Sequence, residues 1–163
     1  MENISTGSAW LLITTLIYFI MNGAGIYETL VIIPKWTASP PESLQVFKEP
    51  YGINLKKFWI GMHSIHELTF ILAIIFCWSL TPIRNWLLIF FIIHFLTRVW
   101  TILYFAPNVI EFQKIANSSD PPAGLISKAT MWRKLNYIRT GISILVSLGF
   151  IPLCIEILCS KLK

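Results

Sequence analysis

The chain has 163 residues, of which 55% are hydrophobic and only 13% are charged, and its formal net charge is +5 at pH 7. A soluble domain carries about 25% charged residues, so this composition excludes an ordinary soluble protein and favours a membrane protein. The excess of basic residues does not indicate nucleic-acid binding, because its placement between apolar segments is explained by membrane topology.

The first apolar segment, residues 9–33, is longer than the roughly 20 residues that a spanning helix needs. Residues 9–21 are followed by Asn-Gly-Ala-Gly at 22–25, which has the small residues that signal peptidase accepts. No Lys or Arg precedes this segment, so the basic start of a signal peptide is missing. We therefore expect a retained membrane helix, with a signal peptide as the alternative.

The loop at 34–57 contains Ser-Pro-Pro-Glu and Glu-Pro-Tyr-Gly, both strong turn signals. Residues 43–48, which lie between these signals, are expected to form one short interfacial turn. The second and third apolar segments follow at 58–80 and 86–105. Because their link at 81–85 is short, we expect these two helices to be antiparallel neighbours.

A break is expected at 117–124, where Asp-Pro-Pro cannot continue a helix. The sequence after Gly124 is compatible with a helix throughout, so the fourth span, 135–159, is expected to begin before the membrane. Pro152 lies within this span and is expected to kink it. Residues 1–163 are thus predicted to form one all-α integral membrane domain, a four-helix transmembrane bundle with antiparallel up-down topology.

The distribution of basic residues predicts the orientation of the bundle. Under the positive-inside rule, the loops richer in Lys and Arg face the cytoplasm. The first and third loops carry Lys35, Lys48, Lys56, Lys57, Lys114, Lys128, Arg133 and Lys134, whereas the other side carries Arg84, Lys161 and Lys163. We therefore expect both of these loops in the cytoplasm, both termini outside it, and the lipid bilayer as the main partner.

Ionisable side chains interrupt all four spans. At 1.5 Å per residue, Glu28, His63 and Arg139 lie about 9 Å from the cytoplasmic boundary, and Glu67 and His94 lie about 15–16 Å from it. Residues three or four positions apart share one face of a helix. The resulting polar faces are His63, His66 and Glu67 on the second helix; His94, Arg98 and Thr101 on the third; and Asn136, Arg139 and Ser143 on the fourth.

These faces predict a polar chamber in the cytoplasmic half of the bundle. Its two acids, Glu28 and Glu67, are expected to form ion pairs with the two arginines, because an unpaired charge at this depth costs several kcal/mol. Interhelical hydrogen bonds and ion pairs can also simply hold a bundle together. A proton-coupled transport path is disfavoured, because the outer half of the bundle offers no obvious polar stripe.

Two kinds of chemistry suit such a chamber. A histidine in a dry pocket can act as a base while arginines hold a developing oxyanion. Alternatively, the three histidines and two glutamates supply nitrogen and oxygen ligands for iron, copper or zinc. The sequence HSIHE at 63–67 matches no common metal motif, and the arginines would oppose a cation, so no cofactor is assigned.

Three stretches carry a family resemblance: GAGIYETLVIIP at 23–34, WTILYFAPN at 100–108 and MWRKLNYIRT at 131–140. Together they resemble the small four-helix membrane proteins of the anthrone-oxygenase-like family, over nearly the whole chain. The resemblance implies oxidation of anthrones to anthraquinones with O₂ and no conventional cofactor. It implies that Tyr27 is a landmark of the first helix and that Trp132 and Arg139 line the site. Some members have His where this chain has Asn136, and asparagine cannot act as a base.

The leading hypothesis is an integral membrane, oxygenase-like protein that acts on a lipophilic phenolic, anthrone or quinone compound. The candidate catalytic residues are His63, His94, Arg98 and Arg139. The candidate substrate-binding residues are Tyr27, Glu28, His66, Glu67, Trp132 and Asn136. The alternatives are a non-catalytic membrane subunit or ligand-binding protein, and a metal- or haem-dependent redox protein; a homo-oligomer is compatible with each of these.

Overall fold

A computed structural model describes residues 5–48, 50–118 and 120–159, and the regular structure within these ranges is entirely helical. Four helices of the described chain are long and apolar enough to cross a membrane, as predicted: Thr6–Trp36, Lys56–Phe76, Thr81–Ala116 and Leu125–Cys159. Their elements are α1 (Thr6–Tyr27), η1 (Glu28–Ile32), α2 (Ile33–Trp36), α3 (Lys56–Phe76), α4 (Thr81–Trp100), η3 (Thr101–Phe105), α5 (Ala106–Ala116) and α6 (Leu125–Cys159), and the short helix η2 (Glu42–Phe47) lies between α2 and α3.

Local sequence signals explain where the helices begin. Ser5 caps α1 by accepting a hydrogen bond from the Ser8 amide, which starts the helix earlier than predicted. The segment at 81–85, predicted to be a link, is instead the first turn of α4, because Pro82 presets a helical backbone angle there. Gly124 adopts a φ of +80°, which favours glycine, directly before α6 begins.

Two of the long helices widen into a π-helical turn, η1 in the first and η3 in the third. In each, the amide of the residue after the turn donates to the carbonyl five residues back. A proline follows each turn, Pro34 and Pro107, and its missing N–H forces the helical ladder to rearrange. The third helix was predicted to end at 105, but this rearrangement lets it continue to Ala116.

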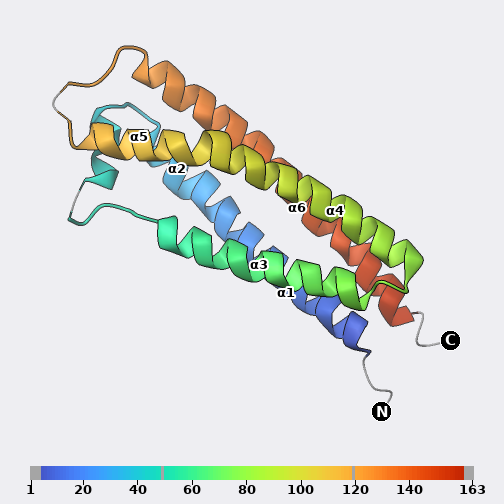
Figure 1. The fold of residues 1–163 in the computed structure, drawn as a ribbon. Helices are drawn as coiled ribbons and strands as arrows, with labels where there is room; N and C mark the ends of the chain where they lie inside the picture. Colours follow the sequence, from blue (N-terminus) through green and yellow to red (C-terminus); the bar gives the residue numbers. More distant parts are fainter. Residues whose placement is uncertain (1–4, 49, 119, 160–163) are drawn as a thin grey trace.

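Figure 1 shows the long helices lying lengthwise against one another. The described ends of the chain lie at the same end as the link between α3 and α4, and η2 lies at the opposite end. From that link, α3 and the α4–α5 helix diverge in this view toward η2. The short helix η2 occupies the place where residues 43–48 were predicted to form a turn.

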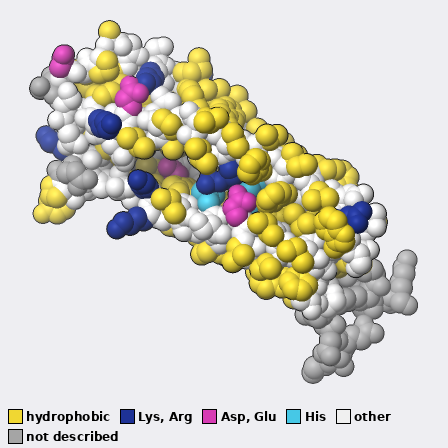
Figure 2. Space-filling model, viewed as in Figure 1, with side chains coloured by type: hydrophobic (Ala, Val, Ile, Leu, Met, Phe, Trp, Pro, Cys, Tyr) yellow, Lys and Arg dark blue, Asp and Glu magenta, His cyan; other side chains and the backbone are white. Residues whose placement is uncertain are grey.

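The interior contains two apolar clusters, one toward each end of the bundle. The first includes Leu11, Tyr18, Phe70, Leu87 and Phe150, and the second includes Trp36, Phe47, Phe105, Phe112 and Trp132. Apolar side chains also cover much of the middle of the face drawn in Figure 2, where a small group of acidic, basic and histidine atoms interrupts them, and further charged side chains lie toward the end that carries η2. Such an apolar exterior suits contact with lipid rather than water.

Candidate functional site

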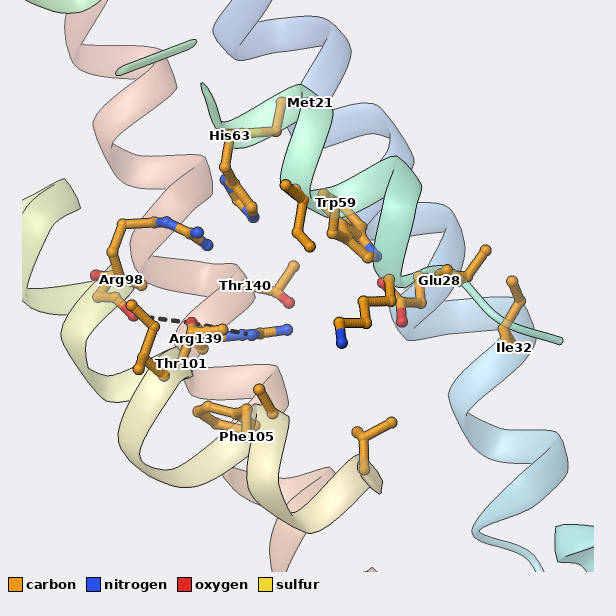
Figure 3. A pocket seen from close by; sticks show the side chains of 18 of the residues that line it. Met21, Glu28, Ile32, Trp59, His63, Arg98, Thr101, Phe105, Arg139 and Thr140 are labelled. Carbon is orange, nitrogen blue, oxygen red and sulfur yellow. Dashed lines mark hydrogen bonds between the residues drawn. The ribbon is translucent and has the colours of Figure 1, made fainter. Parts of the chain in front are cut away.

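A cavity of about 390 Å³ borders both apolar clusters (Figure 3). This volume lies within the range of about 300–1,000 Å³ that is typical of small-molecule sites. Its wall includes side chains from η1, α3, α4, η3 and α6. Among the predicted site residues, those that line it are Glu28, His63, His94, Arg98, Trp132 and Arg139.

Arg139 donates only to neutral groups. Its Nη1 donates to Thr101 Oγ1 at 3.2 Å, and its Nη2 donates to Asn136 Oδ1 at 2.6 Å. Its guanidinium also lies 4.3 Å from the centre of the Phe105 ring. No carboxylate of the described residues lies within 4.0 Å of it, so the prediction that each of the two arginines forms an ion pair with one of the two acids is wrong for Arg139. The guanidinium therefore has no direct ion pair in the described chain, although Glu28, which lines the same cavity, attracts it over a longer distance.

Asn136 accepts a hydrogen bond from Arg139 on the side away from the cavity and so fixes its position. The side chain is fully buried, and its Nδ2 donates to Thr29 Oγ1 at 2.9 Å. The Thr29 hydroxyl in turn lies 2.9 Å from that of Thr140. These bonds connect η1 with α6, and Arg139 extends the network to η3. Asn136 was predicted to contact substrate, but it does not line the cavity and instead orients Arg139.

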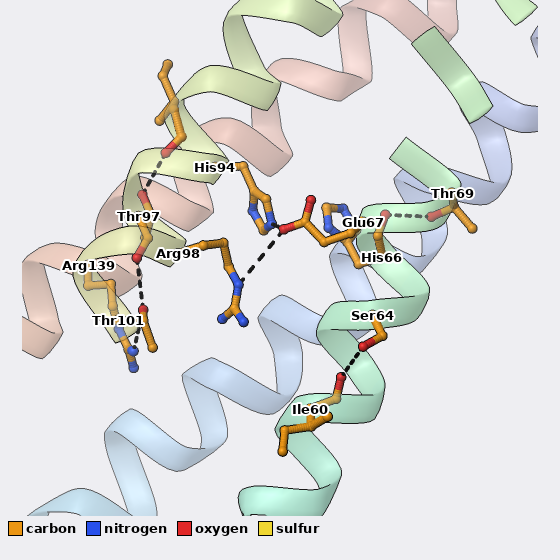
Figure 4. Close-up of polar contacts among 11 residues, drawn as sticks. Ile60, Ser64, His66, Glu67, Thr69, His94, Thr97, Arg98, Thr101 and Arg139 are labelled. Carbon is orange, nitrogen blue, oxygen red and sulfur yellow. Dashed lines mark hydrogen bonds and ion pairs between the residues drawn. The ribbon is translucent and has the colours of Figure 1, made fainter. Parts of the chain in front are cut away.

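Glu67 links α3 to α4 beside the cavity (Figure 4). Its Oε1 accepts a hydrogen bond from His94 Nε2 at 3.0 Å and lies 3.9 Å from Arg98 Nε. The predicted pairing of a buried acid with an arginine is thus confirmed for Glu67 and Arg98, at long range. Glu67 is not part of the cavity wall, and it acts on the cavity only through these two partners.

The three histidines occupy different environments. The His63 ring stacks on Trp59 with centres 5.3 Å apart, and it points into the cavity (Figure 3). His63 Nδ1 has no hydrogen-bond partner in the described chain. His66 is fully buried against Tyr18 and His94, outside the cavity wall, and neither of its ring nitrogens has a partner there. His63 is therefore the histidine best placed to act on a molecule in the cavity.

The family resemblance pointed to Tyr27 and Trp132, and only Trp132 lines the cavity. Tyr27 is 60% exposed and does not line the cavity, because it lies about 100° around the helix from Glu28. Trp132 does line the cavity, and its Nε1 donates to the Phe105 carbonyl oxygen at 3.2 Å, which ties α6 to η3. Trp59 was not predicted, although its position one turn before His63 was a usable signal.

Within the described residues, no three His, Cys, Asp or Glu side chains gather in a way that could hold a metal ion. Comparison of the chain with family models, curated proteins and solved structures gives no match.

Proposed function

We propose that the chain is a multi-pass membrane protein whose four apolar helices run alternately up and down through the bilayer. The loops on either side of η2 and between α5 and α6 face the cytoplasm, and both termini lie on the opposite side. The concentration of Lys and Arg at 35–57 and 114–134, in these loops and on the helix ends beside them, supports this orientation. Four helices of sufficient length and hydropathy support the membrane location itself.

The cavity binds a lipophilic compound that carries an acidic or anionic oxygen. The observation that carries this proposal is Arg139, whose guanidinium faces the cavity while no described carboxylate lies within 4.0 Å. Buried charges are normally paired, and an anionic ligand would supply the direct ion pair that Glu28, which attracts Arg139 from beyond 4.0 Å, does not form. Because Trp59, Phe105 and Ile60 contribute apolar wall, the remainder of the ligand is apolar. Phenolic, anthrone and quinone-type compounds have this combination.

The chemistry proposed is base-assisted oxidation by O₂, as the family resemblance implies. His63 removes a proton from the CH₂ group of an anthrone, and Arg139 stabilises the resulting oxyanion. O₂ then oxidises this carbon, which loses its two hydrogens and gains one oxygen as a carbonyl. The second oxygen atom leaves as water, so one anthrone and one O₂ give one anthraquinone and one H₂O.

The test uses the purified protein in lipid nanodiscs with anthrone in aerated buffer. O₂ uptake and anthraquinone formation should be equal and should exceed the background of empty nanodiscs. His63→Gln should lower the rate by about 100-fold or more, since a positioned base contributes about 10²–10⁴-fold. His66→Phe serves as the control, because His66 lies outside the cavity wall, and it should retain activity. A wild-type rate equal to that of empty nanodiscs would contradict the catalytic proposal.

A non-catalytic ligand-binding protein is the second candidate. It is favoured by one observation: within the described chain no carboxylate forms an ion pair with His63 and its Nδ1 has no hydrogen-bond partner, so the acid that usually orients a histidine base is missing. Binding of the anthrone product without any turnover would support this candidate over the oxygenase.

A further inference from the structure

The cavity wall is exposed on one side only. Its residues from α1, η1 and α6 are all buried or half-buried. The exposed ones all belong to α3 or to the stretch of η3 and α5 that faces it: Lys56, Ile60, Ile102, Ala106 and Ile110. The cavity therefore opens through a slot between α3 and η3–α5.

The rim of this slot is apolar. Ile60, Ile102 and Ile110 are 57%, 61% and 44% exposed, and each also lines the cavity. Ile60 lies about 6 Å along α3 from Lys56, at 1.5 Å per residue. Both bordering helices belong to segments long and apolar enough to span a membrane. The slot thus faces the acyl chains of the bilayer, with Lys56 toward the headgroups.

The ion pair of Glu67 and Arg98 lies at the end of the slot that is nearer the link between α3 and α4. The two side chains are 30% and 21% exposed, and they bridge α3 and α4 nearer the link at which these helices converge. Charged groups that face lipid at this depth are expensive, so the few that occur there almost always face the interior of the bundle or a water-filled cavity. Figure 4 shows Arg98 between Glu67 and the side of η3 that carries Thr101.

We propose that this slot is a lateral portal, through which a lipophilic anion passes directly between the bilayer and the cavity. The apolar rim admits the body of such a compound from the acyl-chain region. Arg98 and Arg139, which both line the cavity, attract its acidic oxygen inward. The identity of the ligand rests on the proposed function, whereas the route rests on the exposure of the wall.

The test follows a reporter cysteine in the cavity. The three cysteines, Cys77, Cys154 and Cys159, are free and are replaced by alanine. Thr97→Cys then places a thiol in the cavity wall on α4. N-(1-pyrenyl)maleimide, dissolved in the lipid of nanodiscs, should label this thiol. Adding Ile60→Trp should slow labelling about tenfold or more, equivalent to about 1.4 kcal/mol of barrier.

The matched control is Leu68→Trp, at a position on the same helix that is 60% exposed but does not line the cavity. It should leave the labelling rate within about twofold, well below the tenfold effect of a 1.4 kcal/mol barrier. Ile102→Trp narrows the slot from its other side and should reproduce the effect of Ile60→Trp. A cooperative thermal unfolding transition shows that each variant is folded. If Ile60→Trp does not fold, Ile102→Trp still tests the portal.

Several outcomes would overturn the portal. One is that the portal variants and the control variant slow labelling equally. Another is that the thiol reacts only with a charged, water-soluble maleimide added to the buffer and not with N-(1-pyrenyl)maleimide in the lipid. A third is that neither of these two maleimides labels the thiol. The experiment contains no candidate substrate, so it is independent of the proposed function. If the thiol is labelled from the lipid but the separate activity assay shows no anthrone turnover, the proposed oxidation is rejected and the portal is not. If anthrone is turned over but the thiol is not labelled from the lipid, the portal is rejected and the proposed function is not.

Discussion

Arg139 Nη2 donates a 2.6 Å hydrogen bond to Asn136 Oδ1, and Asn136 Nδ2 donates at 2.9 Å to Thr29 Oγ1. Because the amide nitrogen and oxygen face different partners, Asn136 connects the guanidinium to η1, while Thr101 holds it from η3. Asn136, whose side chain cannot act as a base, is thus a positioning residue in this chain. The site uses position 136 to aim a positive charge rather than to move a proton.

Asn136→Ala should lower the free energy of unfolding by about 1–3 kcal/mol, because it removes the acceptor of Arg139 Nη2 and leaves the Thr29 hydroxyl with Thr140 as its remaining partner. It should also weaken binding of 1,8-dihydroxyanthraquinone, since Arg139 loses its anchor. Chemical unfolding in detergent and absorbance titration measure the two effects. Thr29→Val is the control: it removes only the far end of the network, so it should affect stability more than binding. Wild-type binding by Asn136→Ala would show that Arg139 does not need the anchor.

His66→Phe should leave the free energy of unfolding unchanged or raise it by about 1 kcal/mol. Both ring nitrogens of His66 are buried without a partner in the described chain, and burial of an unpaired polar group is unfavourable. Phenylalanine restores the ring contacts with Tyr18 and Phe70. Thermal unfolding provides the measurement. A loss of more than about 2 kcal/mol would instead indicate that a polar partner normally satisfies His66.

Glu67→Leu should destabilise the protein by about 1–3 kcal/mol, because it removes the acceptor of His94 and the partner of Arg98. Glu67→Gln keeps an acceptor oxygen for His94 and should cost less than about 1 kcal/mol, as expected for a long and partly exposed ion pair. Unfolding in graded SDS compares the two variants under identical conditions. If Gln is as harmful as Leu, the ionic contact with Arg98 matters more than the hydrogen bond.

Two glycines of α1 should respond in opposite directions to alanine. A Cβ at Gly7 would lie 2.8 Å from the Phe76 carbonyl oxygen, so Gly7→Ala must separate α1 from α3 and should cost about 1–3 kcal/mol. A Cβ at Gly23 would meet nothing within 4 Å, so Gly23→Ala should stabilise the helix by about 0.5–1 kcal/mol. Thermal unfolding of both variants tests this contrast. Destabilisation by Gly23→Ala would reveal a neighbour in the membrane.

The four apolar helices were predictable because bilayer thickness fixes the length of a spanning segment. The residues at which these helices begin and end were harder to predict. A proline such as Pro107 normally ends a helix, but in the structure the π-helical turn η3 accommodates it and the helix continues. Gly124 and the helix that follows it were predicted correctly, since glycine is a reliable boundary signal.

The depth and face of polar residues predicted that His63, His94, Arg98 and Arg139 would line one cavity. The rotation of each helix about its axis and the hydrogen-bond and ion-pair partners of each side chain could not be predicted from the sequence, because both depend on how the four helices pack. Glu67 therefore pairs with Arg98 as expected, whereas Arg139 donates to neutral partners, Thr101 on η3 and Asn136 on its own helix. Tyr27 faces outward for the same reason, since its neighbour Glu28 takes the inward position.

The central claim is that Arg139 binds the anionic oxygen of a lipophilic ligand, and equilibrium binding tests it most directly. Absorbance titration with 1,8-dihydroxyanthraquinone in nanodiscs compares the wild type, Arg139→Gln and Arg133→Gln. Arg133 lies on the same helix, bonds to Thr37 at 3.3 Å and does not line the cavity. Arg139→Gln should weaken binding at least about tenfold, as expected for loss of a hydrogen bond to a charged group, whereas Arg133→Gln should match the wild type. Equal affinities for the wild type and Arg139→Gln would contradict the claim.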